Sequence, residues 1–155
     1  MSERIKILVG TMTGTAELVA DEMAEVLQGR GVEVEILLMD DVTPDALHRS
    51  AGYIVCTSTY GQGDVPDNGQ ALYRSLCDDR PDLAGLRYGV FALGDKTYAQ
   101  TFCAGGRKFD DILRTLGAER VGERREHDGS SGSLPEDEAA DWAEEWHALF
   151  AKADA

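Results

Sequence analysis

Short apolar runs along the chain alternate with longer segments in which apolar residues recur every three or four positions. The apolar runs predict five β-strands, at Ile5–Val9, Val32–Leu38, Tyr53–Thr57, Tyr88–Leu93 and Arg120–Arg124. The longer segments have the periodicity of amphipathic helices. Strands that alternate with helices are typical of βαβ units, which place their strands in one parallel sheet. The pattern therefore predicts an α/β protein.

The predicted strands differ in how completely they are apolar. Tyr53–Thr57 and Tyr88–Leu93 are apolar almost throughout, as is typical of strands that are covered on both faces. Val32–Leu38 begins by alternating apolar and acidic residues, so one of its faces meets water and it suits the edge of the sheet. We therefore expect Tyr53–Thr57 in the centre of the sheet.

Three helices can be placed from their apolar stripes. The first spans about Gly14–Gln28, another spans about Gly106–Leu116, and the last follows Pro135. The first stripe contains Leu18, Val19, Met23, Val26 and Leu27, and the last contains Ala139, Trp142, Trp146, Leu149 and Phe150. Two tryptophans at helical spacing indicate core packing rather than a binding site. A further helix follows the third strand, and either Asp67 or Asn68 can cap it.

Length, composition and cysteine content narrow the class of protein. The 155 residues, 43% hydrophobic and 28% charged, contain no repeat and no compositional break, so we expect one domain over residues 1–155. No signal peptide or membrane-spanning run is evident. Cys56, Cys77 and Cys103 are widely spaced, which argues against a disulfide framework, a zinc site or an iron–sulfur cluster. We expect a cytoplasmic protein without a metal, in which Cys103 is a small buried residue.

Acidic residues outnumber basic ones by 29 to 15, which gives the chain a formal net charge of −14. A charge of this sign argues against nucleic acid or an anionic membrane surface as a partner. The charge has two interpretations: it keeps the protein in solution, or it forms an acidic face that steers basic partner proteins. The sequence leaves both open.

The loop after the first predicted strand, Gly10–Glu17, is rich in threonine and glycine. Three hydroxyl groups and a run of backbone N–H groups lie where the first helix begins. Such a loop can hold a phosphate without lysine or arginine, through hydrogen bonds and the helix dipole. It lacks the second glycine and the lysine of a P-loop and does not fit the dinucleotide-binding motif. A threonine–glycine turn that only caps the helix is the alternative.

Two more loops of similar composition follow the third and fourth strands, within Thr57–Asn68 and Leu93–Cys103. Glycines in the first of these allow the backbone to approach a flat ligand, and each loop contains a tyrosine that offers a stacking face. Because the carboxyl ends of parallel strands meet at one edge of a sheet, all three loops are expected at one site. Together they predict a phosphate subsite beside an aromatic clamp.

The segments TMTGTAE, TSTYGQGDVPDN and LGDKTYAQTFC, in this order, resemble the three FMN loops of flavodoxins. They are most similar to MioC-type free-standing flavodoxins and to the FMN domains of P450-reductase and sulfite-reductase type enzymes. AGGRKFDDILRTLGAERVGE resembles the helix and strand that follow in this family. The resemblance implies a flavodoxin-like three-layer sandwich, with helices on both faces of a five-stranded parallel sheet in the known flavodoxin order 2-1-3-4-5.

The resemblance also implies the cofactor, FMN, and the residues around it. Thr11 through Ala16 would bind the phosphate, Tyr60 and Tyr98 would flank the isoalloxazine ring, and the backbone of 61–63 and 93–95 would meet its polar edge. The implied cofactor-binding residues are Thr11, Met12, Thr13, Gly14, Thr15, Ala16, Ser58, Thr59, Tyr60, Gly61, Gln62, Gly63, Leu93, Gly94, Asp95, Thr97, Tyr98, Phe102 and Cys103.

Three features depart from the family pattern. Gln62 stands where relatives often have an acidic residue, which removes one charge near the ring. The loop between Tyr98 and Phe102 is one residue longer than in those relatives. Beyond the last predicted strand, 126–129 resembles the family's acidic run only loosely, so Asp128 is assigned no definite role.

No set of residues for bond-making chemistry stands out, because His48, His127 and His147 are isolated and the common hydrolase motifs are absent. The resemblance implies a monomeric electron carrier with no independent catalysis. It would take single electrons from an NAD(P)H-dependent flavodoxin or ferredoxin reductase and pass them to an acceptor enzyme, both of them basic partner proteins. The alternatives are an FMN module of a larger diflavin reductase, a flavin-dependent quinone reductase and, from another class, a receiver-type signalling domain.

Overall fold

The computed structural model describes residues 4–11, 14–47, 51–59, 65–94 and 103–153. Within these residues all strands belong to one parallel sheet, in the order β2-β1-β3-β4-β5, and β6 pairs with β4 beyond the end of β5. The strands are β1 (Arg4–Gly10), β2 (Glu33–Leu38), β3 (Gly52–Thr57), β4 (Arg87–Gly94), β5 (Glu119–Arg120) and β6 (Arg125–Asp128). The helices are α1 (Thr15–Gln28), α2 (Asp67–Asp79), α3 (Ala104–Thr115) and α4 (Pro135–Ala153), with single 3₁₀ turns at Met39–Asp41, Pro44–Ala46 and Gly129–Ser131.

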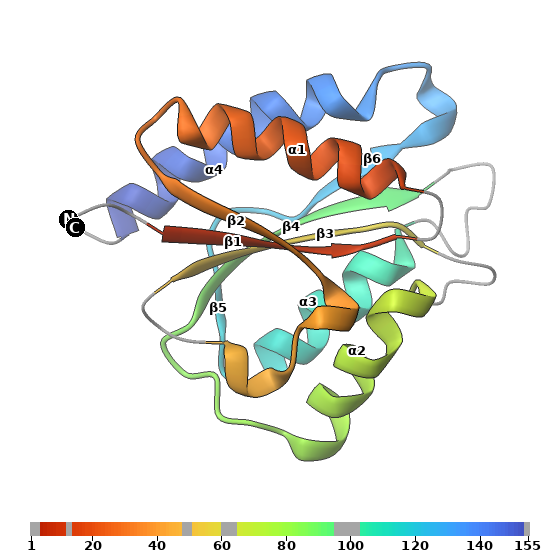
Figure 1. Ribbon diagram of the computed structural model, residues 1–155, viewed down its shortest axis with the longest axis vertical. Coiled ribbons are helices and arrows are strands. Elements are labelled where there is room, and N and C mark those ends of the chain that lie inside the picture. The colour runs from red at the N-terminus through yellow and green to blue at the C-terminus, as the bar shows by residue number, and fades with distance from the viewer. Residues whose placement is uncertain (1–3, 12–13, 48–50, 60–64, 95–102, 154–155) are drawn as a thin grey trace.

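The sheet is the middle layer of three (Figure 1). Helices α1 and α4 cover one face, and α2 and α3 cover the other. This arrangement confirms the predicted flavodoxin-like sandwich and its strand order. The edge position of β2 and the central position of β3 are also confirmed, since residues of β2 are exposed or half-buried while every residue of β3 is buried.

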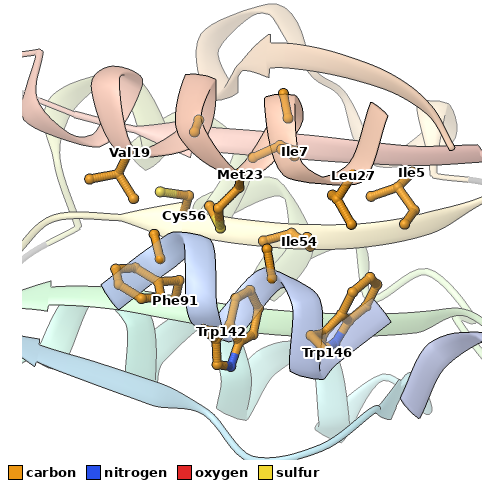
Figure 2. Packing of buried hydrophobic residues seen from close by; sticks show 14 of the residues in the cluster. Ile5, Ile7, Val19, Met23, Leu27, Ile54, Cys56, Phe91, Trp142 and Trp146 are labelled. Atoms are coloured by element: carbon orange, nitrogen blue, oxygen red, sulfur yellow. The ribbon is translucent and has the colours of Figure 1, made fainter. Parts of the chain in front are cut away.

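The two faces of the sheet have separate cores because successive side chains of a strand point to opposite sides. On the α1 and α4 side, Ile7, Ile54 and Phe91 pack against the helices (Figure 2). Trp142 and Trp146 belong to this core, 4% and 1% exposed, with their ring centroids 6.1 Å apart. The prediction that both tryptophans are core residues is confirmed.

Two residues of the predicted stripes are instead exposed. Leu18 is 61% exposed and Leu149 is 47% exposed. Each lies one position, or about 100° around the helix, from a residue that faces the core. In α1 three alanines complete the buried stripe, whose residues are Ala16, Val19, Ala20, Met23, Ala24 and Leu27. A stripe built on alanines brings the helix close to the sheet, which the positions of large residues alone did not predict.

The last strand differs from the prediction of Arg120–Arg124. It is split into β5 and β6, and between them the chain leaves the sheet at 122–124, after Val121 N donates to the Tyr88 carbonyl of β4 at 2.8 Å; Gly122 there has a positive φ of 71°. The segment 126–128, which was predicted to lie beyond the last strand, pairs instead with the end of β4, with His127 opposite Leu93. The prediction therefore missed the four residues of β6, Arg125–Asp128, at the edge where the candidate site lies.

A buried carboxylate stabilises this split. Asp110 of α3 is fully buried, and its Oδ2 lies 2.5 Å from Arg120 Nη1 and 2.5 Å from Arg124 Nη1. Its Oδ1 accepts a hydrogen bond of 2.5 Å from the Tyr88 hydroxyl. Since Arg120 ends β5 and Arg124 precedes β6, one side chain of α3 holds both sides of the break.

Candidate cofactor site

The carboxyl ends of β1, β3 and β4 lie at the same edge of the sheet, and α1 and α3 begin there (Figure 1). The predicted site residues that the structure describes all lie at this edge: Thr11, Gly14, Thr15, Ala16, Ser58, Thr59, Leu93, Gly94 and Cys103. The others fall outside the described residues: Met12, Thr13, Tyr60, Gly61, Gln62, Gly63, Asp95, Thr97, Tyr98 and Phe102.

The first loop leads directly into the N-terminus of α1. Gly14 is the N-cap residue, with a φ of 93°, and its N–H donates to Thr11 Oγ1 at 2.9 Å. Glycine has no side chain with which to cap the first turn of the helix, and a Cβ placed on Gly14 would have no atom of the residues that the structure describes within 4 Å, apart from its chain neighbours. The helix therefore presents its N-terminal N–H groups and its positive dipole end beside an open approach. This donor set fits a phosphate group.

A side chain of α2 fixes the start of the first loop through hydrogen bonds to its backbone. Asn68 Oδ1 accepts from Thr11 N at 2.8 Å, and Asn68 Nδ2 donates to the Val9 carbonyl at 3.0 Å. The N-cap residue of α2 is Pro66 and the helix begins at Asp67, so neither Asp67 nor Asn68 is the capping residue and both predicted alternatives are wrong. The actual role of Asn68 has one weak signal in the sequence: asparagine is a poor choice for a helical position unless its side chain has another partner.

The hydroxyl groups after β3 join neighbouring strand ends. Ser58 Oγ donates to the Gly10 carbonyl at 3.2 Å, and Thr59 Oγ1 donates to the Leu93 carbonyl at 3.2 Å. Thr59 Oγ1 also accepts from Gly105 N, in the first turn of α3, at 3.0 Å. These two side chains thus tie the β1, β3 and β4 ends together, which the sequence did not predict.

The close packing of the start of α3 against the ends of β3 and β4 requires glycine. A Cβ on Gly94 would lie 2.5 Å from Cys103 N, and one on Gly105 would lie 2.5 Å from the Ser58 carbonyl oxygen. Both obstructing atoms belong to the backbone and cannot move aside cheaply. The start of α3 therefore packs directly against the ends of β3 and β4, so that any ligand at this edge meets backbone on this side.

Cys103 is the N-cap residue of α3 and has a left-handed backbone, with a φ of 55°. It is fully buried, which agrees with the prediction of a small buried residue. Burial raises the pKa of its thiol to about 12, so that the thiol stays protonated at neutral pH. Its Sγ lies 3.5 Å from the Ala92 carbonyl oxygen and 3.6 Å from that of His127.

His127 was predicted to be isolated, and this is wrong. It is 2% exposed, and its Nδ1 contacts Glu138 Oε2 in the first turns of α4. Glu138 also pairs with Arg125 at 3.3 Å. The neighbouring Asp128 accepts from Ser130 N at 2.9 Å and so closes the turn after β6. His127, through Glu138, and Asp128, through the turn that it closes, thus fix the start of α4 near the carboxyl end of β4, with which β6 pairs.

Acidic side chains gather at this edge because three helices begin here with them: Glu17 in α1, Asp67 in α2, and Glu136, Asp137 and Glu138 in α4.

In the part of the chain that the structure describes, no three His, Cys, Asp or Glu side chains are grouped so as to hold a metal ion. Among the described helices, none combines the length and the apolar composition that a membrane span requires.

Comparison with known proteins agrees with the resemblance of the three loops and extends it over nearly the whole chain. The flavodoxin family profile matches residues 7–142. The chain is 38% identical over 146 residues to flavodoxin YqcA of Escherichia coli K12, covering 94% of this chain and 97% of that protein. It is 35% identical over 146 residues to the flavoprotein alpha-component of NADPH sulfite reductase from Bacillus subtilis, covering 93% of this chain but 23% of that protein.

A solved structure agrees with these relatives. A cysteine-to-alanine variant of a flavodoxin from Pseudomonas aeruginosa superimposes with a TM-score of 0.82 at 36% identity, over 94% of this chain and 98% of that one. The resemblance inferred from the three loops is thereby confirmed, together with the sandwich architecture that it implied.

Proposed function

Because the chain belongs to the flavodoxin family of electron-transfer flavoproteins, we propose that it binds FMN at the carboxyl ends of β1, β3 and β4. In this role it carries single electrons from a reductase to an acceptor enzyme, as one domain and as a monomer. The bound flavin supplies the redox chemistry, and the protein binds and orients it. FMN rather than riboflavin is the proposed cofactor because the donor groups at the start of α1 fit a phosphate.

The observation that carries the proposal is the uncharged donor set at the start of α1. A phosphate there would meet N–H groups of the first helical turn and the hydroxyl groups of Thr11 and Thr15, with the positive end of the helix dipole behind them. Thr11 is held by Asn68 and Gly14 is held by Thr11, so this part of the donor set is ordered before a ligand arrives. The ring would lie between Tyr60 and Tyr98, with the backbone of 61–63 and 93–95 at its polar edge.

The acidic side chains at the same edge support a basic partner surface. Those in the first turns of α1, α2 and α4 surround the site and would attract a positively charged reductase or acceptor. Because salt screens exposed charges, electron transfer should slow as ionic strength rises. A reductase that uses NAD(P)H is the proposed donor. The cytoplasm is the proposed location, and the three free cysteines of the described residues suit a reducing compartment.

One comparison favours a second candidate, the FMN module of a diflavin enzyme. The Bacillus subtilis sulfite reductase component aligns with this chain over 23% of its length. The Escherichia coli flavodoxin is the more similar of these two relatives, at 38% identity against 35%, which supports the free-standing carrier. The two differ in their electron supply. A free-standing carrier receives electrons from a separate reductase protein, whereas the FMN module of a diflavin enzyme receives them from the reductase part of its own enzyme.

Reconstitution with FMN tests the proposal, with Thr15→Val as the informative variant. The purified apoprotein should turn yellow and quench FMN fluorescence at one FMN per chain. Thr15→Val removes one hydroxyl donor to the phosphate, and a hydrogen bond to a charged group of this kind corresponds to roughly tenfold in affinity. Thr115→Val, which removes an exposed hydroxyl from α3, is the matched control and should bind as the wild type does. Folded protein that stays colourless with FMN would overturn the proposal.

A further inference from the structure

The end of β1 is held in place by a side chain of α2, which lies on the opposite face of the sheet from α1 (Figure 1). Asn68 is the second residue of α2, and its amide bonds to the backbone on both sides of Gly10. Its Oδ1 accepts from Thr11 N at 2.8 Å and its Nδ2 donates to the Val9 carbonyl at 3.0 Å. The amide thus fixes the last β1 residues and the first residue of the loop together.

The hydrogen bonds continue from Thr11 to the start of α1. Thr11 Oγ1 accepts from Gly14 N at 2.9 Å, and Gly14 is the N-cap residue of α1. On the other side, the Gly10 carbonyl accepts from Ser58 N at 3.0 Å. A continuous series of hydrogen bonds therefore links α2, the first loop and the N-terminus of α1, and Asn68 is the residue of α2 that joins it.

Asparagine is suited to this place because its amide carries one acceptor and one donor group. Aspartate has the same shape but cannot donate to the Val9 carbonyl, and leucine can form neither bond. If the amide is lost, Thr11 N and the Val9 carbonyl must find other partners. The loop would then lose the constraint that directs Thr11 and, through it, Gly14.

We propose that Asn68 is a positioning residue for the phosphate subsite and that it sets the preference of the protein for FMN over riboflavin. This inference rests on the proposed function. Asn68 holds Thr11, and through it Gly14, in place before the cofactor arrives, so the phosphate does not have to order these two residues. The ends of β3 and β4, where the ring would lie, are held by other groups, including Thr59. The effect of Asn68 is therefore specific to the phosphate end.

The expected effect is a change in the ratio of two affinities. One unsatisfied buried partner corresponds to roughly tenfold in an equilibrium constant. In Asn68→Leu, FMN affinity should fall about tenfold while riboflavin affinity changes less than about twofold. Asn68→Asp should show the same selective loss, because it keeps the shape of the side chain but removes the donor and adds a negative charge near the phosphate.

The experiment measures quenching of flavin fluorescence by apoprotein titrated with FMN and, separately, with riboflavin. Gln70→Leu is the matched control. Gln70 is also in the first turns of α2, and its Nε2 donates to a backbone carbonyl, that of Val65, at 3.2 Å. It should leave both affinities as in the wild type. Inorganic phosphate should compete with FMN for the wild type and compete less well for Asn68→Leu.

The outcomes are distinct. A selective loss of FMN affinity in both Asn68 variants supports the proposal, and if Asn68→Leu does not fold, the isosteric Asn68→Asp decides. A parallel fall of FMN and riboflavin affinity means that Asn68 supports the whole site, and unchanged affinities mean that it has no role; either result overturns the inference while the proposed function stands. A folded wild type that binds no FMN overturns both.

Discussion

Replacing Asp110 by asparagine tests whether one buried carboxylate holds the last strand of the sheet together. The substitution keeps the shape of the side chain and removes its charge. It also replaces one acceptor oxygen by an NH₂ group, which would face guanidinium donors if it took the place of Oδ2. In the native protein Oδ2 lies 2.5 Å from a guanidinium nitrogen of Arg120 and of Arg124.

The magnitude follows from the burial of the three charged groups. Asp110 is 0% exposed, whereas the side chains of Arg120 and Arg124 are 25% and 23% exposed. Removing one partner of a buried ion pair costs about 3–5 kcal/mol. Because both guanidinium groups keep contact with water and can regain hydration, we expect the lower end, about 3 kcal/mol. For a domain of this size that corresponds to roughly 6–12 °C in melting temperature.

Urea unfolding, followed by tryptophan fluorescence and by far-UV circular dichroism, measures the loss. Asp111→Asn is the control, since Asp111 is the exposed neighbour on the same helix and its change should cost less than about 0.5 kcal/mol. If Asp110→Asn lowers the free energy of unfolding no more than Asp111→Asn does, the carboxylate does not hold the strand and the reasoning fails.

Two further predictions concern stability. Burial raises the pKa of the Cys103 thiol to about 12 and raises the pKa of Cys56 and, with help from its hydrogen bond to Asp110, of Tyr88. The unfolded chain releases the two thiol protons above about pH 9 and the Tyr88 proton above about pH 10, so the free energy of unfolding should fall from there by up to about 1.4 kcal/mol per pH unit for each group. Urea titrations from pH 8 to 11 check this, with a shallower fall expected for Cys56→Ala; a flat profile would contradict it. Gly89→Ala should cost about 1–3 kcal/mol, because its Cβ would lie 2.2 Å from Trp146 Nε1 in a ring stack that cannot yield. Gly132→Ala is the control, because a Cβ there meets no atom of the described residues within 4 Å and only backbone strain is added. Thermal unfolding should show a smaller loss of stability for Gly132→Ala than for Gly89→Ala; equal losses would rule out the steric argument for Gly89.

Much of the candidate site was predictable because parallel strands bring their carboxyl ends to one edge. Loops that are far apart in the sequence could therefore be assigned to one place from their composition alone. The contacts among them were not predictable. Asn68 and Thr11 are 57 residues apart, and nothing in the spacing indicates that an amide of one helix holds the loop before another. The same is true of His127, whose partner Glu138 lies in a different element.

The order of apolar and polar residues was enough to place the first four strands, to distinguish the edge strand from the central one, and to position the hydroxyl-rich loops. These properties depend on local periodicity, which each segment carries by itself. The split of the last strand, the choice of alanine over Leu18 as a core contact, and the hydrogen bonds that shape the first loop depend on which elements meet. Only packing in three dimensions decides them, because a buried polar group such as Asp110 is stable only where its partners converge.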